Sequence, residues 1–270
     1  MQAAEFQFLS GLLKKRSGLA LTEEKQYLVE SRLLPVARKH GCDSVISLVS
    51  LIKSKPKEEI LNEVTEAMTT NESLFFRDTK PFDYLRQATL PEYKAIPGKN
   101  SLRIWSAACS TGQEPYSIAM CLLEEAAKMA GWRYEIIATD LAVKVLDRAK
   151  EGVYSQFEIQ RGLPIQMLIK YFTQQPGTTS WQAKENLRTM VNYRMQNLLE
   201  DLSPLGKFDI IFCRNVLIYF DEDTRAMVAG HLARLLPRGG HLFLGSTEML
   251  IDRTNLFTAS DQCRGLYRLK

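Results

Sequence analysis

The sequence lacks the residue patterns that mark disulfide-stabilised and metal-binding proteins. Its cysteines are odd in number and form no C-x-x-C motif: Cys42, Cys109, Cys121, Cys213 and Cys263. This usage favours reduced thiols in a cytoplasm over a disulfide framework or a zinc site. Histidine is scarce, and His40, His231 and His241 do not stand at metal-ligand spacing. We therefore expect no metal.

A membrane span and a signal peptide are also missing from the sequence. No apolar run approaches the roughly 20 residues that a span requires. The basic residues Lys14, Lys15 and Arg16 follow the first apolar stretch, whereas a signal peptide carries its charge before it. The net charge of +4, from 35 basic and 31 acidic residues, does not demand a nucleic-acid partner. These features predict a cytoplasmic protein without membrane insertion.

What the first 90 residues do contain is a succession of helical patterns. Apolar residues recur at helical spacing from Phe6 to Leu13. Thr22 precedes two glutamates and predicts the start of a helix that runs to His40, with a kink or break at Pro35. Two further helices are expected at about 43–54 and 57–69. This region is expected to be all-α.

From residue 101 the pattern changes to short apolar strands that alternate with helices, which is typical of a parallel α/β sheet. We expect strands at 101–107, 134–139, 208–213 and 241–246, and an edge strand at 263–269. Helices are expected at 114–128, 142–150 and 222–235. Residues 152–196 interrupt this alternation, and 181–184 with 190–195 are predicted to flank a small antiparallel pair in an inserted subdomain.

The first strand leads into a turn that is suited to a ligand. Small residues from Ser106 to Gly112 let a ligand approach the backbone, and such sites lie at the carboxyl ends of parallel strands. Glu114 stands in the first turn of the next helix, where its charge would repel a phosphate but accept hydrogen bonds from a cationic amino group. The turn also lacks the G-x-G-x-x-G pattern of dinucleotide sites. The ligand is therefore expected to be cationic, as S-adenosylmethionine (SAM) is.

Three polar residues end later segments of the α/β region. Asp140 closes the second strand and is placed either to accept the hydroxyls of an adenosine ribose or to cap the next helix. Asn197 and Asn215 are each candidates to reach the ligand as neutral amides, or to serve as turn or cap residues.

Long, ordered stretches of the sequence resemble the CheR family of chemotaxis receptor methyltransferases. The matching stretches are T-T-N-E-S-L-F-F-R (69–77), W-S-A-A-C-S-T-G-Q-E-P-Y-S-I-A (105–119), A-T-D-L (138–141), Q-N-L-L (196–199) and F-D-I-I-F-C-R-N-V-L-I-Y-F (208–220). The resemblance implies an α/β fold with a Rossmann-like SAM-dependent methyltransferase domain, an inserted small antiparallel β-subdomain and an all-α N-terminal domain. It predicts a helical substrate-recognition domain at 1–78, a linker helix at 79–95, and a SAM-binding domain at 96–270 with its insertion at 155–196.

The resemblance also implies a cofactor, a substrate and a set of site residues. The expected activity is protein-glutamate O-methylation of the cytoplasmic domain of chemotaxis receptors by a monomer, with S-adenosylhomocysteine as the second product. SAM would be held by Asn71, Ser73, Arg77, Glu114, Asp140, Asn197, Leu198, Asn215 and Val216. Ser73 stands where the family usually has threonine, and Gln113 where it usually has glutamate. The serine keeps the hydroxyl group, and Glu114 is retained.

Two residues are candidates for a role in the reaction itself. Arg77 is always charged and binds carboxylates bidentately, so it is suited to hold either the receptor glutamate or the SAM carboxylate. Tyr219 is placed either to line the methyl-transfer path or to pack as a core aromatic residue. The segment that contains it lacks the Pro-Pro of the methyltransferases that act on nucleic-acid bases.

The family resemblance assigns receptor binding to basic residues of the second helix. Lys25, Arg32 and Arg38 stand at the matching positions, and a solvated helix face is the alternative reading. In part of the family the β-subdomain binds a receptor pentapeptide as an added strand. The turn at 174–180 is shorter here, which favours a pentapeptide-independent enzyme. Two other functions stay open: methylation of another carboxylate or a nucleic acid, and SAM sensing without catalysis.

Overall fold

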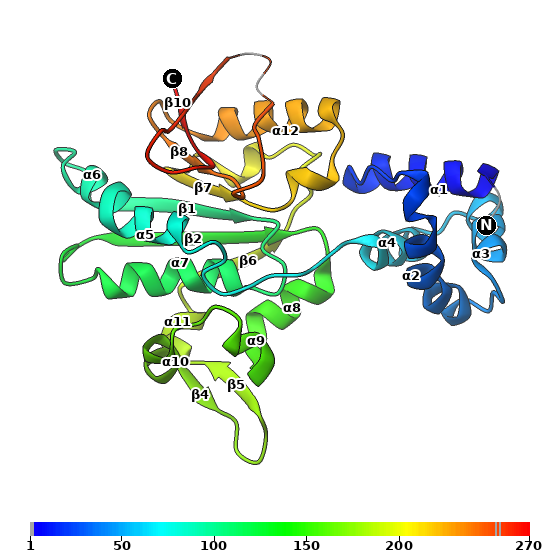
Figure 1. Cartoon of the computed structure of the whole chain (residues 1–270), viewed down its shortest axis with the longest axis horizontal. Helices are drawn as coiled ribbons and strands as arrows, with labels where there is room; N and C mark the ends of the chain where they lie inside the picture. Colours follow the sequence, from blue (N-terminus) through cyan, green and yellow to red (C-terminus); the bar gives the residue numbers. More distant parts are fainter. Residues whose placement is uncertain (1–2, 252, 254) are drawn as a thin grey trace. The chain divides into compact units, whose positions relative to one another are not determined.

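The chain forms two compact units in a computed structural model that describes residues 3–251, 253 and 255–270. The first unit comprises Met1–Thr70 with Ile218–Arg225, and the second comprises Asn71–Leu217 with Ala226–Lys270. The first is helical, and the second contains two β-sheets (Figure 1). Across the described ranges, no helix is long and apolar enough to cross a membrane.

Helices of the first unit pack around an aliphatic core that includes Leu9, Val29 and Leu48, all fully buried. Their bounds are α1 (Ala3–Ser17), α2 (Gln26–Lys39), α3 (Val45–Ser54) and α4 (Glu58–Met68). The predicted all-α region is confirmed.

The start of this helical segment agrees with the sequence pattern, because Thr22 stands at the N-cap position. The segment opens with a 3-10 turn, Glu23–Lys25, before α2 begins at Gln26, and the Thr22 side chain makes no cap hydrogen bond. The helix α2 continues through Pro35 without the predicted break. The exposed proline lacks the N–H for one backbone hydrogen bond, but Leu33 before it and Ala37 after it are both buried and hold the two turns around it in the core.

The second unit is built on a seven-stranded sheet in the order β6-β2-β1-β7-β8-β10-β9. The first five of these strands are parallel, and β10 and β9 are antiparallel to their neighbours. The strand bounds are β1 (Ser101–Ala107), β2 (Arg133–Asp140), β6 (Val191–Met195), β7 (Ile210–Cys213), β8 (His241–Phe243), β9 (Phe257–Ala259) and β10 (Leu266–Leu269). The predicted parallel α/β sheet is thus confirmed.

Two strand predictions need correction. The strand at 190–195 does not belong to a small antiparallel pair, because β6 lies parallel to β2 in the main sheet. The last strand, β10, is not an edge strand, because β9 pairs with its outer side and forms the edge instead. In both cases a short apolar run indicated a strand but carried no information about its partner.

Helices cover the two faces of the main sheet, with α12 on one side and α7 on the other (Figure 1). Their bounds are α5 (Lys80–Tyr84), α6 (Leu90–Lys94), α7 (Gln113–Glu124), α8 (Val143–Glu151) and α12 (Glu222–Leu235). A single π-helical turn at Leu85–Thr89 joins α5 to α6, so that 80–94 is one continuous helical segment.

A smaller sheet in the order β3-β5-β4 forms the core of the inserted subdomain. Both of its pairings are antiparallel, as predicted from the sequence. The strands are β3 (Val153–Ser155), β4 (Phe172–Gln174) and β5 (Ser180–Ala183), and the short helices are α9 (Gln156–Gln160), α10 (Ile165–Tyr171) and α11 (Glu185–Arg188).

The segment that precedes α5 is anchored to this subdomain by Phe75. Its side chain is fully buried, and its ring meets Tyr154 edge-on at 5.0 Å and Phe172 at 5.5 Å between centroids. A Cβ atom at Gly162 would lie 2.2 Å from the Phe75 carbonyl oxygen, so only glycine fits there. Phe75 therefore fixes residues 71–77, which carry three of the predicted cofactor ligands.

Replacing Phe75 by alanine should destabilise the protein by about 3–5 kcal/mol, because a large buried ring is lost from a packed aromatic cluster. The matched control is Phe157→Ala, since that ring is 65% exposed and its loss should cost less than about 1 kcal/mol. Urea denaturation followed by circular dichroism measures both values. Equal midpoints for the two variants would contradict the anchoring role of Phe75.

Candidate functional site

The strand order brings the predicted ligands to one edge of the main sheet. The chain steps from β1 to β2 in one direction and from β7 to β8 in the other, so the topological switch lies between β1 and β7. Ligands of open α/β sheets bind at the carboxyl ends of the strands beside such a switch. The residues found at these ends are Glu114 after β1, Asp140 at the end of β2, Asn197 after β6 and Asn215 after β7.

The turn between β1 and α7 has an unusual backbone. Ala108 and Ser110 have positive φ angles of 53° and 51°, which L-residues other than glycine adopt only at a cost. Gly112 has φ +94°, and a Cβ atom there would lie 2.9 Å from the Tyr193 hydroxyl oxygen. The Ser110 hydroxyl donates to the Asn71 carbonyl at 2.8 Å and ties this turn to the 71–77 segment. Strain of this kind is often found where a backbone is shaped for a ligand.

Asp140 is buried, with 7% of its surface exposed, and is oriented by two backbone groups. Its Oδ2 accepts from the Ser110 N–H at 2.8 Å, and its Oδ1 accepts from the Ala142 N–H at 3.0 Å, just before α8. The helix-start role and the ligand role are compatible, because each carboxylate oxygen can accept more than one hydrogen bond. The oriented carboxylate is suited to a pair of ribose hydroxyls.

Glu114 is held by an ion pair in the interior. Its Oε2 lies 3.0 Å from Nη1 of Arg214, and its Oε1 accepts from the Ser106 hydroxyl at 2.8 Å. Burial raises the pKa of Glu114 above its usual value, and the nearby Arg214 charge opposes that rise. The carboxylate therefore sits where an additional cation would stabilise its ionised form.

Arg214 is a site residue that the sequence reading missed. Its side chain is 1% exposed, and its Nη2 donates to the Arg77 carbonyl at 2.6 Å and to the Asp78 carboxylate at 2.8 Å. Its guanidinium also lies over the Phe82 ring at 5.4 Å from the centroid. A charged residue directly after a fully buried strand was the available signal, because burying an arginine is costly unless it is paired.

The turn after β7 carries Asn215 and Val216. Asn215 has φ +59°, a left-handed conformation that asparagine tolerates better than most residues. Its N–H donates to Glu248 Oε2 at 2.6 Å, and the Leu217 N–H donates to Glu248 Oε1 at 2.8 Å. Glu248 follows β8, and the sequence reading did not identify it.

The remaining predicted cofactor ligands flank these groups along the chain. Ser73 and Arg77 are half-buried, and the Arg77 Nη1 donates to the Glu72 carbonyl at 3.3 Å. Asn197 shapes its own turn, because its Oδ1 accepts from the Leu199 N–H at 3.1 Å. Leu198 is buried, and its carbonyl lies 3.1 Å from Nδ1 of His231. Their contacts to a cofactor stay predictions.

Four predicted residues belong to the first unit. Tyr219 is half-buried, and its carbonyl accepts from the Ala20 N–H at 2.9 Å. Lys25 and Arg38 are exposed, whereas Arg32 is half-buried and donates to the Met68 carbonyl at 2.9 Å. Their catalytic and receptor-binding roles stay predictions.

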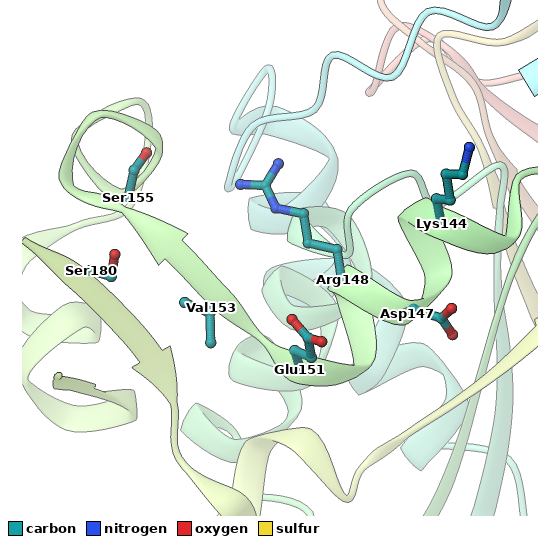
Figure 2. Close-up of a pocket in the computed structure, with 7 residues that line it drawn as sticks. All are labelled: Lys144, Asp147, Arg148, Glu151, Val153, Ser155 and Ser180. Carbon is teal, nitrogen blue, oxygen red and sulfur yellow. The ribbon is translucent and has the colours of Figure 1, made fainter. Parts of the chain in front are cut away.

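A hollow beside α8 and the small sheet shares no residue with the predicted cofactor set. It is lined by Lys144, Asp147, Arg148, Glu151, Val153, Ser155 and Ser180 (Figure 2). Arg148 is already paired with Glu158, at 2.7 Å to both carboxylate oxygens. Two acidic and two basic side chains line this hollow, so its charge does not select a ligand of one sign.

Known proteins match the chain over nearly its whole length. Residues 71–265 match the family model described as CheR methyltransferase, SAM binding domain, and residues 4–69 match CheR methyltransferase, all-alpha domain. The chain belongs to the CheR methyltransferase family. The chemotaxis protein methyltransferase of Vibrio anguillarum is 42% identical over 255 residues, which is 94% of this chain and 92% of that protein.

Other CheR relatives extend the match across distant bacteria. Chemotaxis protein methyltransferase 1 of Pseudomonas aeruginosa is 42% identical over 92% of this chain and 90% of its own length. The chemotaxis protein methyltransferase of Borreliella burgdorferi is 37% identical over 92% of this chain and 90% of its own length. The chain is therefore a SAM-dependent methyltransferase, and its cofactor is SAM.

The donor set at the carboxyl ends fits SAM on chemical grounds. Asp140 is a buried carboxylate, and Glu114 keeps only 12% of its side chain exposed. Two such carboxylates suit a ribose diol and an ammonium group but would repel phosphates. SAM carries two positive charges and one negative charge, so its net charge complements such a site. Gly112 keeps the turn open where a Cβ atom would collide with neighbouring side chains.

Cofactor affinity should fall at acidic pH because of Glu114. The raised pKa means that Glu114 gains a proton at a higher pH than an ordinary carboxyl group, and the neutral acid attracts an ammonium group less. We expect Glu114→Gln to bind S-adenosylhomocysteine about 10- to 100-fold more weakly at neutral pH and to show a flatter pH profile. Calorimetry at several pH values measures both effects.

The matched control for Glu114 lies at the other end of the same helix. Glu124 ends α7, and its carboxylate pairs with Lys170 at 2.7 Å, far along the helix from the strand ends. Glu124→Gln should keep the affinity and the pH profile of the unmodified protein. Identical profiles for the unmodified protein and Glu114→Gln would show that Glu114 does not contact the cofactor.

Proposed function

We propose that this enzyme transfers the methyl group of SAM to glutamate side chains of chemotaxis receptors, forming glutamate methyl esters and S-adenosylhomocysteine. The observation that carries the proposal is the match of both domains to the CheR family, together with relatives named chemotaxis protein methyltransferases. The physical character of the site supports this reaction, because the carboxylates of Asp140 and Glu114 favour a cationic cofactor over a phosphate.

The reaction is a displacement at carbon that needs no general base. SAM, when bound, supplies a methyl group on a positively charged sulfur. A carboxylate oxygen forms the new C–O bond while the S–C bond breaks, and the bonding electrons go to the sulfur. Glutamate is ionised at neutral pH because its unperturbed pKa is about 4.3, so no proton has to be removed.

The protein's contribution is therefore to bind, orient and exclude water. Glu114 is placed to hold the cofactor ammonium group, and Asp140 to hold the ribose hydroxyls. Arg77 supplies the positive charge for a carboxylate, either of the cofactor or of the receptor glutamate. Arg214 donates hydrogen bonds to the Arg77 carbonyl and to the Asp78 carboxylate. The buried Arg214 therefore helps to position the half-buried Arg77.

Base lability of the product tests the proposed reaction. Incubating the enzyme with receptor membranes and methyl-labelled SAM should give labelled receptor, and mild alkali should release the label as methanol because methyl esters hydrolyse there. Receptor with glutamines at its methylated positions is the control and should stay unlabelled. Alkali-stable label, or methylation of RNA or small acids instead of receptor, would contradict the proposal.

Receptor docking is proposed to involve exposed basic residues at the two ends of α2. Lys25 lies in the 3-10 turn just before the helix and Arg38 in its last turn, and both are exposed. The family resemblance places receptor methylation sites on acidic helices. Arg32 has an additional internal role, because its guanidinium donates to the carbonyls of Met68 and Thr69 at 2.9 and 3.2 Å. It thereby satisfies backbone acceptors at the end of α4, which a helix terminus leaves open.

Because their contacts differ, substitutions of Lys25, Arg32 and Arg38 are expected to have different effects. Lys25→Ala and Arg38→Ala should each raise the KM for receptor by up to about fivefold at low salt, since an exposed ion pair contributes about 0.2–1 kcal/mol. Both should leave S-adenosylhomocysteine affinity and thermal stability unchanged. Arg32→Ala should in addition lower the melting temperature. Unchanged KM values at low salt for both exposed variants would contradict docking through Lys25 and Arg38.

A further inference from the structure

Glu248 connects the ends of two neighbouring strands of the main sheet. It follows β8, and its side chain accepts hydrogen bonds from three backbone N–H groups: Asn215 at 2.6 Å, Gly245 at 2.7 Å and Leu217 at 2.8 Å. The residue is 6% exposed. Two of the three donors belong to the turn after β7, which carries the proposed cofactor ligands Asn215 and Val216.

The geometry of this turn explains why a carboxylate is needed. Asn215 has a left-handed backbone with φ +59°, and a turn of that shape points successive N–H groups inward, where they find no strand partner. One carboxylate can satisfy several such donors at once, because it has two acceptor oxygens and no donor. A neutral amide would present an NH₂ group to one of these N–H groups.

Gly245 completes the surroundings of Asn215 from the other side. A Cβ atom at position 245 would lie 2.6 Å from Nδ2 of Asn215 and 2.8 Å from Oε2 of Glu248. The Asn215 side chain therefore occupies space that any larger residue at 245 would fill. Glu248 fixes the backbone of Asn215, and Gly245 leaves room for its amide.

We propose that Glu248 is a positioning residue for the cofactor: with Gly245 it holds the Asn215–Leu217 turn in the shape that binds SAM, without touching SAM itself. The inference rests on the proposed role of Asn215 in cofactor binding. The simpler alternative is that Glu248 only stabilises the fold, and the two roles differ in what they do to cofactor affinity at equal stability.

A matched control for Glu248 lies at the opposite end of β7. Asp209 directly precedes that strand, and its carboxylate accepts from the Arg103 N–H at 2.9 Å and from Lys99 Nζ at 2.7 Å. Asp209→Asn therefore disturbs a carboxylate that lies next to the same strand and accepts from the backbone of β1, but at the edge of the sheet away from the cofactor residues.

The first experiment compares Glu248→Gln with Asp209→Asn. Calorimetry should show S-adenosylhomocysteine binding weakened about 10- to 100-fold in Glu248→Gln and changed less than about twofold in Asp209→Asn, although both lower the melting temperature. Affinity like that of the unmodified protein in Glu248→Gln, or an equal loss in both variants, overturns the positioning role.

Gly245→Ala perturbs the same turn by another route and covers the case in which Glu248→Gln does not fold. It should weaken S-adenosylhomocysteine binding, whereas Gly230→Ala in α12, where an added Cβ meets nothing within 4 Å, should not. Unchanged affinity in Gly245→Ala contradicts the inference.

A double-mutant cycle tests whether Glu248 acts through the Asn215 turn. If it does, adding Glu248→Gln to Asn215→Ala should weaken binding by much less than it does in the unmodified protein. If the losses of affinity in the two single variants multiply in full in the double variant, Glu248 does not act through the Asn215 turn. That result overturns the positioning role of Glu248 but not the cofactor role of Asn215. Unchanged affinity in Asn215→Ala itself instead overturns the cofactor role of Asn215, and the positioning role of Glu248 with it.

Discussion

The ion pair between Glu114 and Arg214 is the interaction on which the rest of the second unit's site depends. It joins α7 to the turn after β7, and through Arg77 and Asp78 it also reaches the segment before α5. Neither charge could be buried alone, because desolvation costs several kcal/mol per ion. The buried charge of Glu114 therefore depends on that of Arg214, and the reverse is also true. Neither charge is stable in the interior until α7, the turn after β7 and the segment before α5 have come together. The site is consequently formed by tertiary structure and not by a single motif.

Around this pair, backbone N–H groups and carboxylates complete one another. Asp140 accepts from the turn after β1, and Glu248 accepts from the turn after β7. Parallel strands end together at one edge of the sheet, so the turns that follow them expose donors that no strand satisfies. Acidic side chains satisfy these donors and at the same time make the edge electronegative. A cationic cofactor is thus favoured by the same residues that allow the turns to adopt left-handed conformations at Ser110 and Asn215.

The sequence predicted the parts of this arrangement that are local. Apolar runs such as 101–107 and 208–213 indicated strands, and the small residues before Glu114 indicated a ligand turn, because each signal lies within a few neighbouring positions. The partner of a strand is not local, so the sequence pattern places β6 in the wrong sheet and β10 at the edge. The roles of Arg214 and Glu248 are hidden in the sequence for a related reason: Glu114 lies 100 residues from Arg214, and two of the three donors to Glu248 lie 31 and 33 residues from it. An isolated arginine or glutamate in a sequence gives no indication of such a partner.

The chemistry explains why residues without ligand contact matter in this enzyme. A methyl transfer to an ionised carboxylate requires neither a base nor an acid, so no side chain has to be tuned to exchange a proton at neutral pH. What remains for the protein is the distance and angle between the methyl carbon and the attacking oxygen, and small misplacements are costly for such in-line reactions. Residues that set the shape of a turn, as Arg214 does for 77–78 and as we propose for Glu248 at 215–217, would then act on the reaction through the groups that they position. Cofactor binding in this site therefore depends on residues that position the ligand-binding groups as well as on those groups themselves.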